Sequence, residues 1–229
     1  MDEMIETVEL PLFPLNTVLF PGQVLPLHIF EERYRLMIRH CLAQDLPFGV
    51  VLIKRGQEVG EEAEPYMVGT VARIIESTHL GNGTMNIVTV GLDRFRIRRL
   101  LHDQPYLRGQ VLSLPMADPD DPEKVLAVAE RVRQGVQRYV ELIAEAAGLQ
   151  IQIEEVPTGA QQIGYLAAVT MQIDNKEKQE LLGSVSVSQM LRREIALLGR
   201  ENALLTWMSG SKEWPESAQF GFSGTLLPN

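Results

Sequence analysis

The chain has 229 residues, 45% of them hydrophobic, a formal net charge of −9 and a single cysteine, Cys41. This length allows one large domain or two small ones with a substantial core, and the acidic balance argues against general binding to nucleic acid or anionic membranes. One cysteine excludes an internal disulfide, and no apolar run reaches the roughly 20 residues of a membrane helix. With an acidic rather than basic N-terminus, these features predict a cytoplasmic protein without a membrane segment.

The stretch LPLFPLNTVLFPGQVLPLHIFEERY, residues 10–34, is densely apolar but divided by four prolines. Proline lacks a backbone donor, so each piece is too short for a helix interior or a long central strand. We expect two short strands, Leu10–Leu15 and Gln23–Ile29, with a turn at Pro21-Gly22 between them. A helix follows from Glu31. The phenylalanines Phe20 and Phe30 are expected in the core.

The rest of the first half reads as short strands separated by turn residues. Gly81-Asn82-Gly83 predicts a tight hairpin because each of these residues tolerates positive φ. The expected strands are Phe48–Lys54, Tyr66–His79, Thr84–Val90, Asp93–Leu101 and Arg108–Leu114. Six or seven short strands in this spacing predict a small, partly closed β-barrel over residues 1–116.

The second half is helical. Asp121 and Pro122 predict the start of a long amphipathic helix, and Gly148 its end. Two shorter helices are expected over Thr158–Gln172 and Lys176–Leu182, and the spacing Ser186-x-x-Gln189 predicts the start of a last one. We therefore expect a helical bundle over residues 117–208 and a flexible tail over 209–229.

Three sequence blocks resemble the Lon N-terminal domain, the substrate-binding module of the ATP-dependent Lon proteases. They are the run from 11 to 34, VGTVARI (Val68–Ile74) and GLDRFRI (Gly91–Ile97). The helical segment Ile163–Leu182 is also similar, so the resemblance spans nearly the whole chain. Stand-alone bacterial relatives, which carry no ATPase or protease domain, are more similar still.

The resemblance implies an α+β fold: a PUA-like β-barrel of the Lon N-domain type, followed by an α-helical bundle. It also implies a non-catalytic module that binds unfolded or extended polypeptide, as an adaptor or chaperone-like factor beside an ATP-dependent protease. The alternative is nucleic-acid binding, because the Lon barrel resembles the RNA-associated PUA fold. A continuous basic patch of Arg73, Arg94 and Arg96 would favour that alternative.

A search for chemistry finds no phosphate-binding loop, nucleophile elbow or H-E-x-x-H motif. The four histidines lack metal-ligand spacing. We therefore expect no catalytic residue, metal or cofactor. An enzyme with an unrecognised site at Glu76, His79 and Asp93 is a remote third alternative.

The candidate peptide-binding residues come from two features. Arg94 and Arg96 share one face of a strand and form either a cationic groove or an ordinary solvated face. Phe30, Tyr34 and Tyr165 are expected to line an apolar groove between barrel and bundle, and strand addition at a barrel edge is a second route. Several methionines would add adaptable contacts if exposed: Met67, Met85, Met116, Met171 and Met190.

Overall fold

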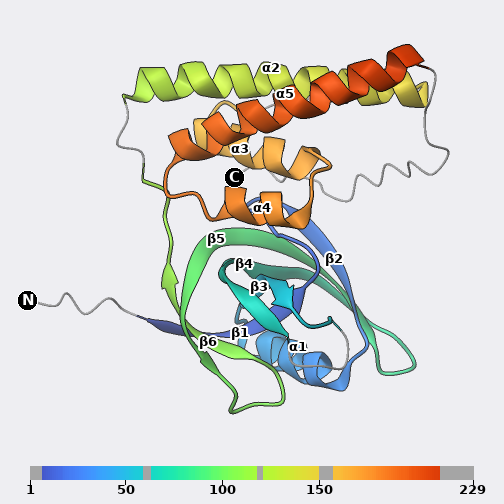
Figure 1. Cartoon of the computed structure of the whole chain (residues 1–229). Helices are drawn as coiled ribbons and strands as arrows, with labels where there is room; N and C mark the ends of the chain where they lie inside the picture. Colours follow the sequence, from blue (N-terminus) through green and yellow to red (C-terminus); the bar gives the residue numbers. More distant parts are fainter. Residues whose placement is uncertain (1–6, 59–62, 118–120, 150–156, 212–229) are drawn as a thin grey trace, which may run out of the picture. The chain divides into compact units, whose positions relative to one another are not determined.

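The structure is a computed structural model that describes residues 7–58, 63–117, 121–149 and 157–211 (Figure 1). It divides into two compact units. The sheet unit combines the residues up to Pro115 with Asp174–Gly183. The helical unit combines Met116–Ile173 with the described residues from Ser184 onward. The sequence boundaries expected at 116 and 208 stay a prediction.

The sheet unit contains one six-stranded sheet in the order β2-β5-β4-β3-β1-β6, in which β5 also pairs with β6. This extra pairing closes five of the strands into a ring, and all pairs are antiparallel except β1–β3. The α+β class, with a ring-like sheet followed by helices, is confirmed. The strands are β1 (Val8–Leu15), β2 (Val24–Ile29), β3 (Phe48–Arg55), β4 (Glu64–His79), β5 (Met85–Leu101) and β6 (Arg108–Ser113).

The long strand β5 makes the closure possible. The sequence predicts two strands, Thr84–Val90 and Asp93–Leu101, but the structure joins them into one strand of 17 residues. Gly91 does not interrupt this strand: its backbone N–H donates to Gln23 O at 2.9 Å, and a Cβ there would lie 2.3 Å from Phe20 O. The first part of β5 pairs with β2, and the last part with β6.

Local turns place the first strands as expected. Gln23 N donates to Phe20 O at 3.1 Å across Pro21-Gly22, and Gly22 has a φ of 81°. This is the positive φ that the turn requires of its glycine. Helix α1 (Glu32–Gln44) then buries Tyr34 and Cys41. Burial raises the pKa of the Cys41 thiol to about 11, so this thiol is neutral at physiological pH.

Packing around Phe95 explains why the blocks VGTVARI and GLDRFRI occur together in this fold: Phe95 belongs to the second block, and Gly69 of the first makes room for its ring. This buried ring belongs to a core cluster with Leu12 and Val51. A Cβ on Gly49 would lie 2.6 Å from the Phe95 ring, and a Cβ on Gly69 would lie 2.8 Å from it. The two glycines on β3 and β4 therefore provide the space that this ring occupies.

The helical unit contains α2 (Pro122–Ala147), α3 (Ala160–Thr170) and α5 (Val187–Ser211). The expected N-caps are confirmed: the Asp121 side chain accepts from Glu123 N at 3.0 Å, and Ser186 Oγ accepts from Gln189 N at 3.2 Å. Gly148 ends α2 with a φ of 66°. These contacts satisfy backbone groups that a helix end leaves without an internal partner.

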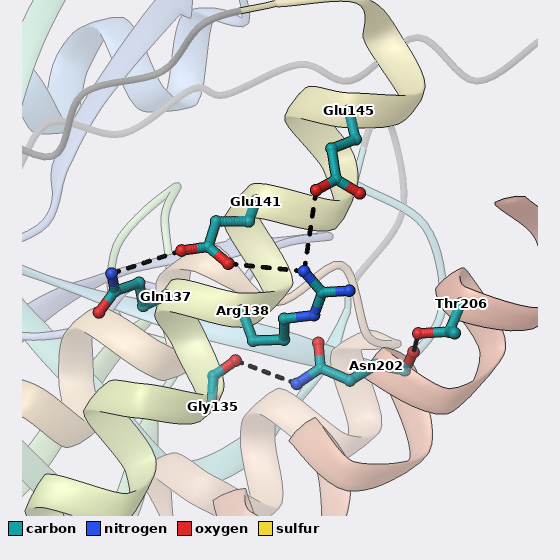
Figure 2. A network of polar contacts seen from close by, with 7 residues as sticks. All are labelled: Gly135, Gln137, Arg138, Glu141, Glu145, Asn202 and Thr206. Carbon is teal, nitrogen blue, oxygen red and sulfur yellow. Dashed lines mark hydrogen bonds and ion pairs between the residues drawn. The ribbon is translucent and has the colours of Figure 1, made fainter.

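Polar contacts join α2 to α5 in the helical unit (Figure 2). Asn202 Nδ2 of α5 donates to Gly135 O of α2 at 3.1 Å. Gly135 permits this approach, because a Cβ there would lie 3.0 Å from Leu198. On α2 itself, Arg138 lies 3.6 Å from Glu141 and 3.8 Å from Glu145, a solvent-facing arrangement that contributes little stability.

The segment after α3 returns to the sheet unit. Helix α4 (Asn175–Leu182), expected as a member of the bundle, groups with the strands instead. The last helix α5 extends to Ser211, two residues beyond the expected start of the tail at 209. The remaining tail residues, 212–229, lie outside the described part of the chain. No helix among the described residues is both long and apolar enough to cross a membrane.

Candidate binding surface

Helix α4 is attached to the sheet by hydrogen bonds from side chains to backbone carbonyls. Asn175 Nδ2 donates to Asn16 O, and Gln179 Nε2 donates to Val68 O at 3.0 Å. In the opposite direction, Arg94 Nη1 of β5 donates to Leu182 O, the last carbonyl of α4. A cation at a helix C-terminus interacts favourably with the partial negative charge there. These three contacts fix α4 on the sheet.

This attachment changes the interpretation of the arginine-rich strand. Arg94 is only 3% exposed because its guanidinium lies against the end of α4, whereas Arg96 and Arg98 are exposed. Arg94 is therefore not available to an exposed cationic groove. For the same reason, Arg73, Arg94 and Arg96 do not form the continuous basic patch that would favour nucleic-acid binding.

The three aromatic candidates differ in exposure. Phe30 is 50% exposed, contrary to its expected place in the core. Tyr34 is 5% exposed: its ring stacks on Phe13 with centroids 4.1 Å apart, and the Arg33 guanidinium lies 4.6 Å from its centroid. Burial raises the pKa of Tyr34 to about 12.

Tyr165 belongs to the helical unit and is also 5% exposed, with its hydroxyl accepting from Gln161 Nε2 at 3.2 Å. Among the five candidate residues, Phe30 and Arg96 are therefore the two that solvent reaches readily. A role in peptide binding stays a prediction for all five: Phe30, Tyr34, Arg94, Arg96 and Tyr165.

Methionines contribute less exposed surface than the sequence suggested. Met85, Met171 and Met190 are fully buried and fill the cores of their units. Met67 on β4 is 44% exposed, and Met116 is half-buried. Adaptable methionine contacts at the surface of the sheet unit therefore come from Met67.

One partly exposed region of the sheet unit, the β2–β5 ribbon, consists of β2 and the first six residues of β5. β2 (VLPLHI) and the part of β5 that pairs with it, Met85–Val90 (MNIVTV), contain no aspartate, glutamate, lysine or arginine. Pro26 and His28 are exposed, and Val24, Val88 and Val90 are half-buried. At the end of β2, the His28 and Phe30 rings are stacked with centroids 6.0 Å apart.

β2 also lies at the end of the sheet order, and among the described strands it pairs with β5 alone. In the ring itself, each strand has neighbours on both sides. The ribbon therefore combines an uncharged face with an unpaired backbone edge. The sequence signal for this surface was present in the charge-free run from Leu10 to Phe30, but its position at a sheet edge was not.

The described residues contain no cluster of three or more histidine, cysteine, aspartate or glutamate residues that could hold a metal ion. The remote enzymatic alternative gains no support either, because Glu76, His79 and Asp93 are all exposed on long strands and not gathered in a buried site.

Glu194 is a buried ionisable residue that the sequence interpretation missed. It is fully buried on α5, and neither carboxylate oxygen has a hydrogen-bond partner among the described residues. Burial raises its pKa well above the ordinary value for a glutamate. Its position between Leu191 and Leu198, at the spacing of the apolar stripe, was the signal that could have identified it.

Comparison with known proteins gives a consistent result. The family model of the ATP-dependent protease La (LON) substrate-binding domain matches residues 9–200. A Lon protease of Anaeromyxobacter dehalogenans is 29% identical over 198 residues, which cover 86% of this chain and 24% of that protein. Lon protease 2 of Herpetosiphon aurantiacus is 30% identical over 205 residues, covering 85% and 24%. The chain thus spans about a quarter of the length of these relatives.

Two solved structures are similar in fold. The crystal structure of a Lon N-terminal domain protein from Xanthomonas campestris aligns with a TM-score of 0.62 and 26% identity, covering 82% of this chain and 98% of that one. The N-terminal domain of a Lon protease from the Mycobacterium avium complex aligns with a TM-score of 0.60 and 18% identity, covering 86% and 98%.

Proposed function

This chain belongs to the LON substrate-binding domain family, and we propose that it is a non-catalytic module that binds segments of other polypeptides. The observation that carries the proposal is the match of the substrate-binding model to residues 9–200, which include strands β2 to β6 and most of the described part of each unit. The match does not extend to an ATPase or protease function, because only about a quarter of each Lon relative corresponds to this chain.

The surface of the sheet unit supports this proposal. An extended, unfolded segment presents backbone donors and acceptors together with apolar side chains. The β2–β5 ribbon offers the matching groups: an unpaired strand edge, a face without formal charge, and the exposed ring of Phe30. Binding of this kind needs no catalytic residue, metal or cofactor.

We also propose the setting in which this binding takes place. The protein acts in the cytoplasm as an adaptor or chaperone-like factor in protein quality control, and an ATP-dependent protease is its partner. The buried thiol of the single cysteine is compatible with a reducing compartment. The proposal distinguishes this chain from an enzyme that processes the bound segment itself.

The test is a binding measurement with one protein in two states. Reduced and carboxymethylated α-lactalbumin is permanently unfolded, and native α-lactalbumin is its folded control. We expect the full chain to bind the unfolded form at micromolar concentrations and the native form at least tenfold more weakly. The unfolded form carries additional negative charge, so the measurement is repeated with a reduced and carboxamidomethylated sample, which is uncharged at the modified cysteines. Equal affinity for folded and unfolded forms, or no binding of either, contradicts the proposal.

A further inference from the structure

The backbone of β2 alternates between two directions. Gly91 N donates to Gln23 O at 2.9 Å, and Thr89 Oγ1 donates to Leu25 O at 2.9 Å. Carbonyls of odd-numbered residues therefore point toward β5. In an antiparallel pair, successive residues direct their N–H and C=O groups to opposite edges. The backbone groups of Val24, Pro26 and His28 thus point away from β5, along the outer edge of the sheet.

This outer edge lacks the usual protection against pairing. Natural edge strands commonly carry lysine or another charge, a bulge or a proline. β2 carries no charged residue, and its pairing with β5 from Val24 to Ile29 has no register shift. Pro26 is the one protective feature, and it removes a single N–H in the middle of the edge. The N–H groups of Val24 and His28 and the three carbonyls remain.

We propose that an extended segment of an unfolded polypeptide adds to this edge of β2 as a further strand, with apolar side chains beside those of Val24, Pro26 and His28. The inference rests on the proposed function and names the place and manner of binding. The backbone groups of Val24, Pro26 and His28 hold the segment, and the exposed ring of Phe30 contacts it at one end. Main-chain hydrogen bonds give such a site affinity for many sequences.

The lack of formal charge on the ribbon determines which segments fit. Strands β2 and Met85–Val90 contribute nothing to the formal net charge of −9, and the charged residues in register with this part of β5, Arg73 and Glu76, lie on β4, away from the β2 edge. A basic segment likewise finds no carboxylate on these two strands. The site therefore selects uncharged, apolar segments, the kind that a folded protein keeps in its core and an unfolded one exposes.

Pro26 also distinguishes a foreign segment from a second copy of this chain. When two β2 edges pair around a two-fold axis, each proline removes one donor, so the pair loses two hydrogen bonds. A foreign segment without proline loses one. The register that places the two Pro26 residues opposite each other has no hydrogen bond at its centre. The edge is therefore better suited to a foreign segment than to self-association.

Residue-resolved amide hydrogen exchange tests the site directly on the full chain, with reduced and carboxamidomethylated α-lactalbumin as the probe. At about 90% saturation, exchange at Val24 and His28 should slow about tenfold, because only the free tenth of the protein exchanges. The amides of Leu25 and Leu27 are the internal control. They already point toward β5, so their exchange should change little.

Two substitutions at one position separate backbone from side chain. His28→Pro removes the outward N–H, and edge strands tolerate proline. His28→Ala keeps the N–H but removes the imidazole that contacts Asn86 at 2.6 Å. We expect His28→Pro to weaken binding of the probe at least fivefold and His28→Ala to change it less than twofold. Circular dichroism checks folding, and Val24→Pro with Val24→Ala serves as the replacement pair if His28→Pro unfolds.

The outcomes are distinct. Binding of the probe without slower exchange at Val24 and His28, or with full affinity in His28→Pro, overturns the β2 site while polypeptide binding itself stands. No binding of the probe at all removes the proposed function and this site together. Exchange at the two amides that slows with protein concentration in the absence of probe identifies a second copy as the occupant and also overturns the proposal.

Discussion

Among the described residues, each unit buries one side chain of the Arg, Lys, Asp and Glu types, and the two lie in different surroundings. In the sheet unit, Arg94 donates to Leu182 O, and the buried side chains of Thr70, Thr89 and Gln179 likewise donate to backbone carbonyls, those of Leu19, Leu25 and Val68. In the helical unit, Glu194 is fully buried and neither of its oxygens has a partner among the described residues. Around it lie Gly164, Met190 and Leu191, which supply no polar side chain.

The difference follows from where backbone groups are free. A helix interior uses its own N–H and C=O groups within the helix, so it offers little to a neighbouring side chain. Turns, strand edges and the last turn of a helix leave carbonyls without such partners. The sheet unit brings several of these ends together, and Leu182 at the end of α4 is one of them. Among the described residues, the buried guanidinium of Arg94 is stabilised at the end of a helix, whereas the buried carboxyl of Glu194 lies within a helix and lacks such a partner.

The largest expected change in the free energy of unfolding comes from apolar packing in the sheet unit. The changes expected for polar contacts are compared with it. Phe20→Ala should lower the free energy of unfolding by roughly 3–5 kcal/mol, because it empties a site that is 0% exposed. Phe30→Ala, at a site that is 50% exposed, should change it by less than about 0.5 kcal/mol. Urea denaturation measures both variants. A similar loss in both would mean that Phe30 is packed rather than available to a ligand.

The second expected effect tests whether Arg94 stabilises the sheet unit through α4. Arg94→Met keeps most of the side-chain volume but leaves Leu182 O without this donor, and the loss should be about 2–3 kcal/mol, near the upper range for a hydrogen bond to a charged group. Arg96→Met is the matched control on the exposed face and should cost less than about 0.5 kcal/mol. Equal stability of the two variants would mean that the bond to Leu182 O does not stabilise the sheet unit, and Arg94 would then not differ from Glu194 in this respect.

The third effect is the dependence of stability on pH that Glu194 imposes on the helical unit. Its folded-state pKa is raised, so the folded protein binds a proton that the unfolded chain releases above its own pKa of about 4.5. Below that pH, the protonated carboxyl of Glu194 makes its full contribution to the free energy of unfolding. It declines by about 1.4 kcal/mol per pH unit as the pH rises toward the folded-state pKa.

Glu194→Gln removes this titration while keeping the shape of the side chain. Relative to the wild type, the variant should therefore gain about 1.4 kcal/mol per pH unit as the pH rises from the unfolded-state pKa toward the raised folded-state pKa of Glu194. Chemical denaturation at several pH values measures the difference. Glu201→Gln, at a half-buried position of the same helix, is the control for the Glu-to-Gln exchange itself. Parallel stability curves for Glu194→Gln and the wild type would show that Glu194 is ionised and has found a partner.

The smallest effect concerns helix N-caps, a type of contact that occurs in each unit. Asp121 caps α2 by accepting from Glu123 N at 3.0 Å, and Asp174 caps α4 by accepting from Glu177 N at 2.7 Å. Each aspartate→alanine substitution should cost about 1 kcal/mol, the usual value for an N-cap. Asp→Asn variants, which retain a capping oxygen, are the controls. Similar losses in the two units would locate their difference in tertiary contacts, whereas a much larger loss at one cap would mean that this aspartate does more than cap its helix.

Sequence reasoning went furthest where the determining interaction is local. The turn at Pro21-Gly22, the hairpin ending at Gly83, and the caps at Asp121 and Ser186 each depend on residues within a few positions of one another. Their φ preferences and capping side chains act in the same way in most proteins, so the pattern alone predicts them. The same holds for the buried stripe of α2, because helical periodicity places those residues on one face.

The candidate site was predicted less completely. Phe30 follows the six residues of β2, and its apolar neighbours in the sequence predict a buried ring. In the structure, however, it is 50% exposed at the end of this edge strand. Arg94 alternates with buried residues and looks like solvent-facing charge, yet it is 3% exposed. In both cases, exposure depends on which element lies beside the strand, and that element is distant in the sequence or absent.

The sequence by itself determined the element types, most turns and caps, and, through three blocks of residues, the family. Tertiary structure decided that β5 would be one strand joining β2 to β6, that α4 would return to the sheet, and that β2 would pair with β5 alone among the described strands. The physical reason is the range of the interactions. Backbone conformation and capping depend on near neighbours, whereas burial of Arg94, isolation of Glu194 and exposure of β2 depend on residues brought together from across the chain, such as Arg94 and Leu182.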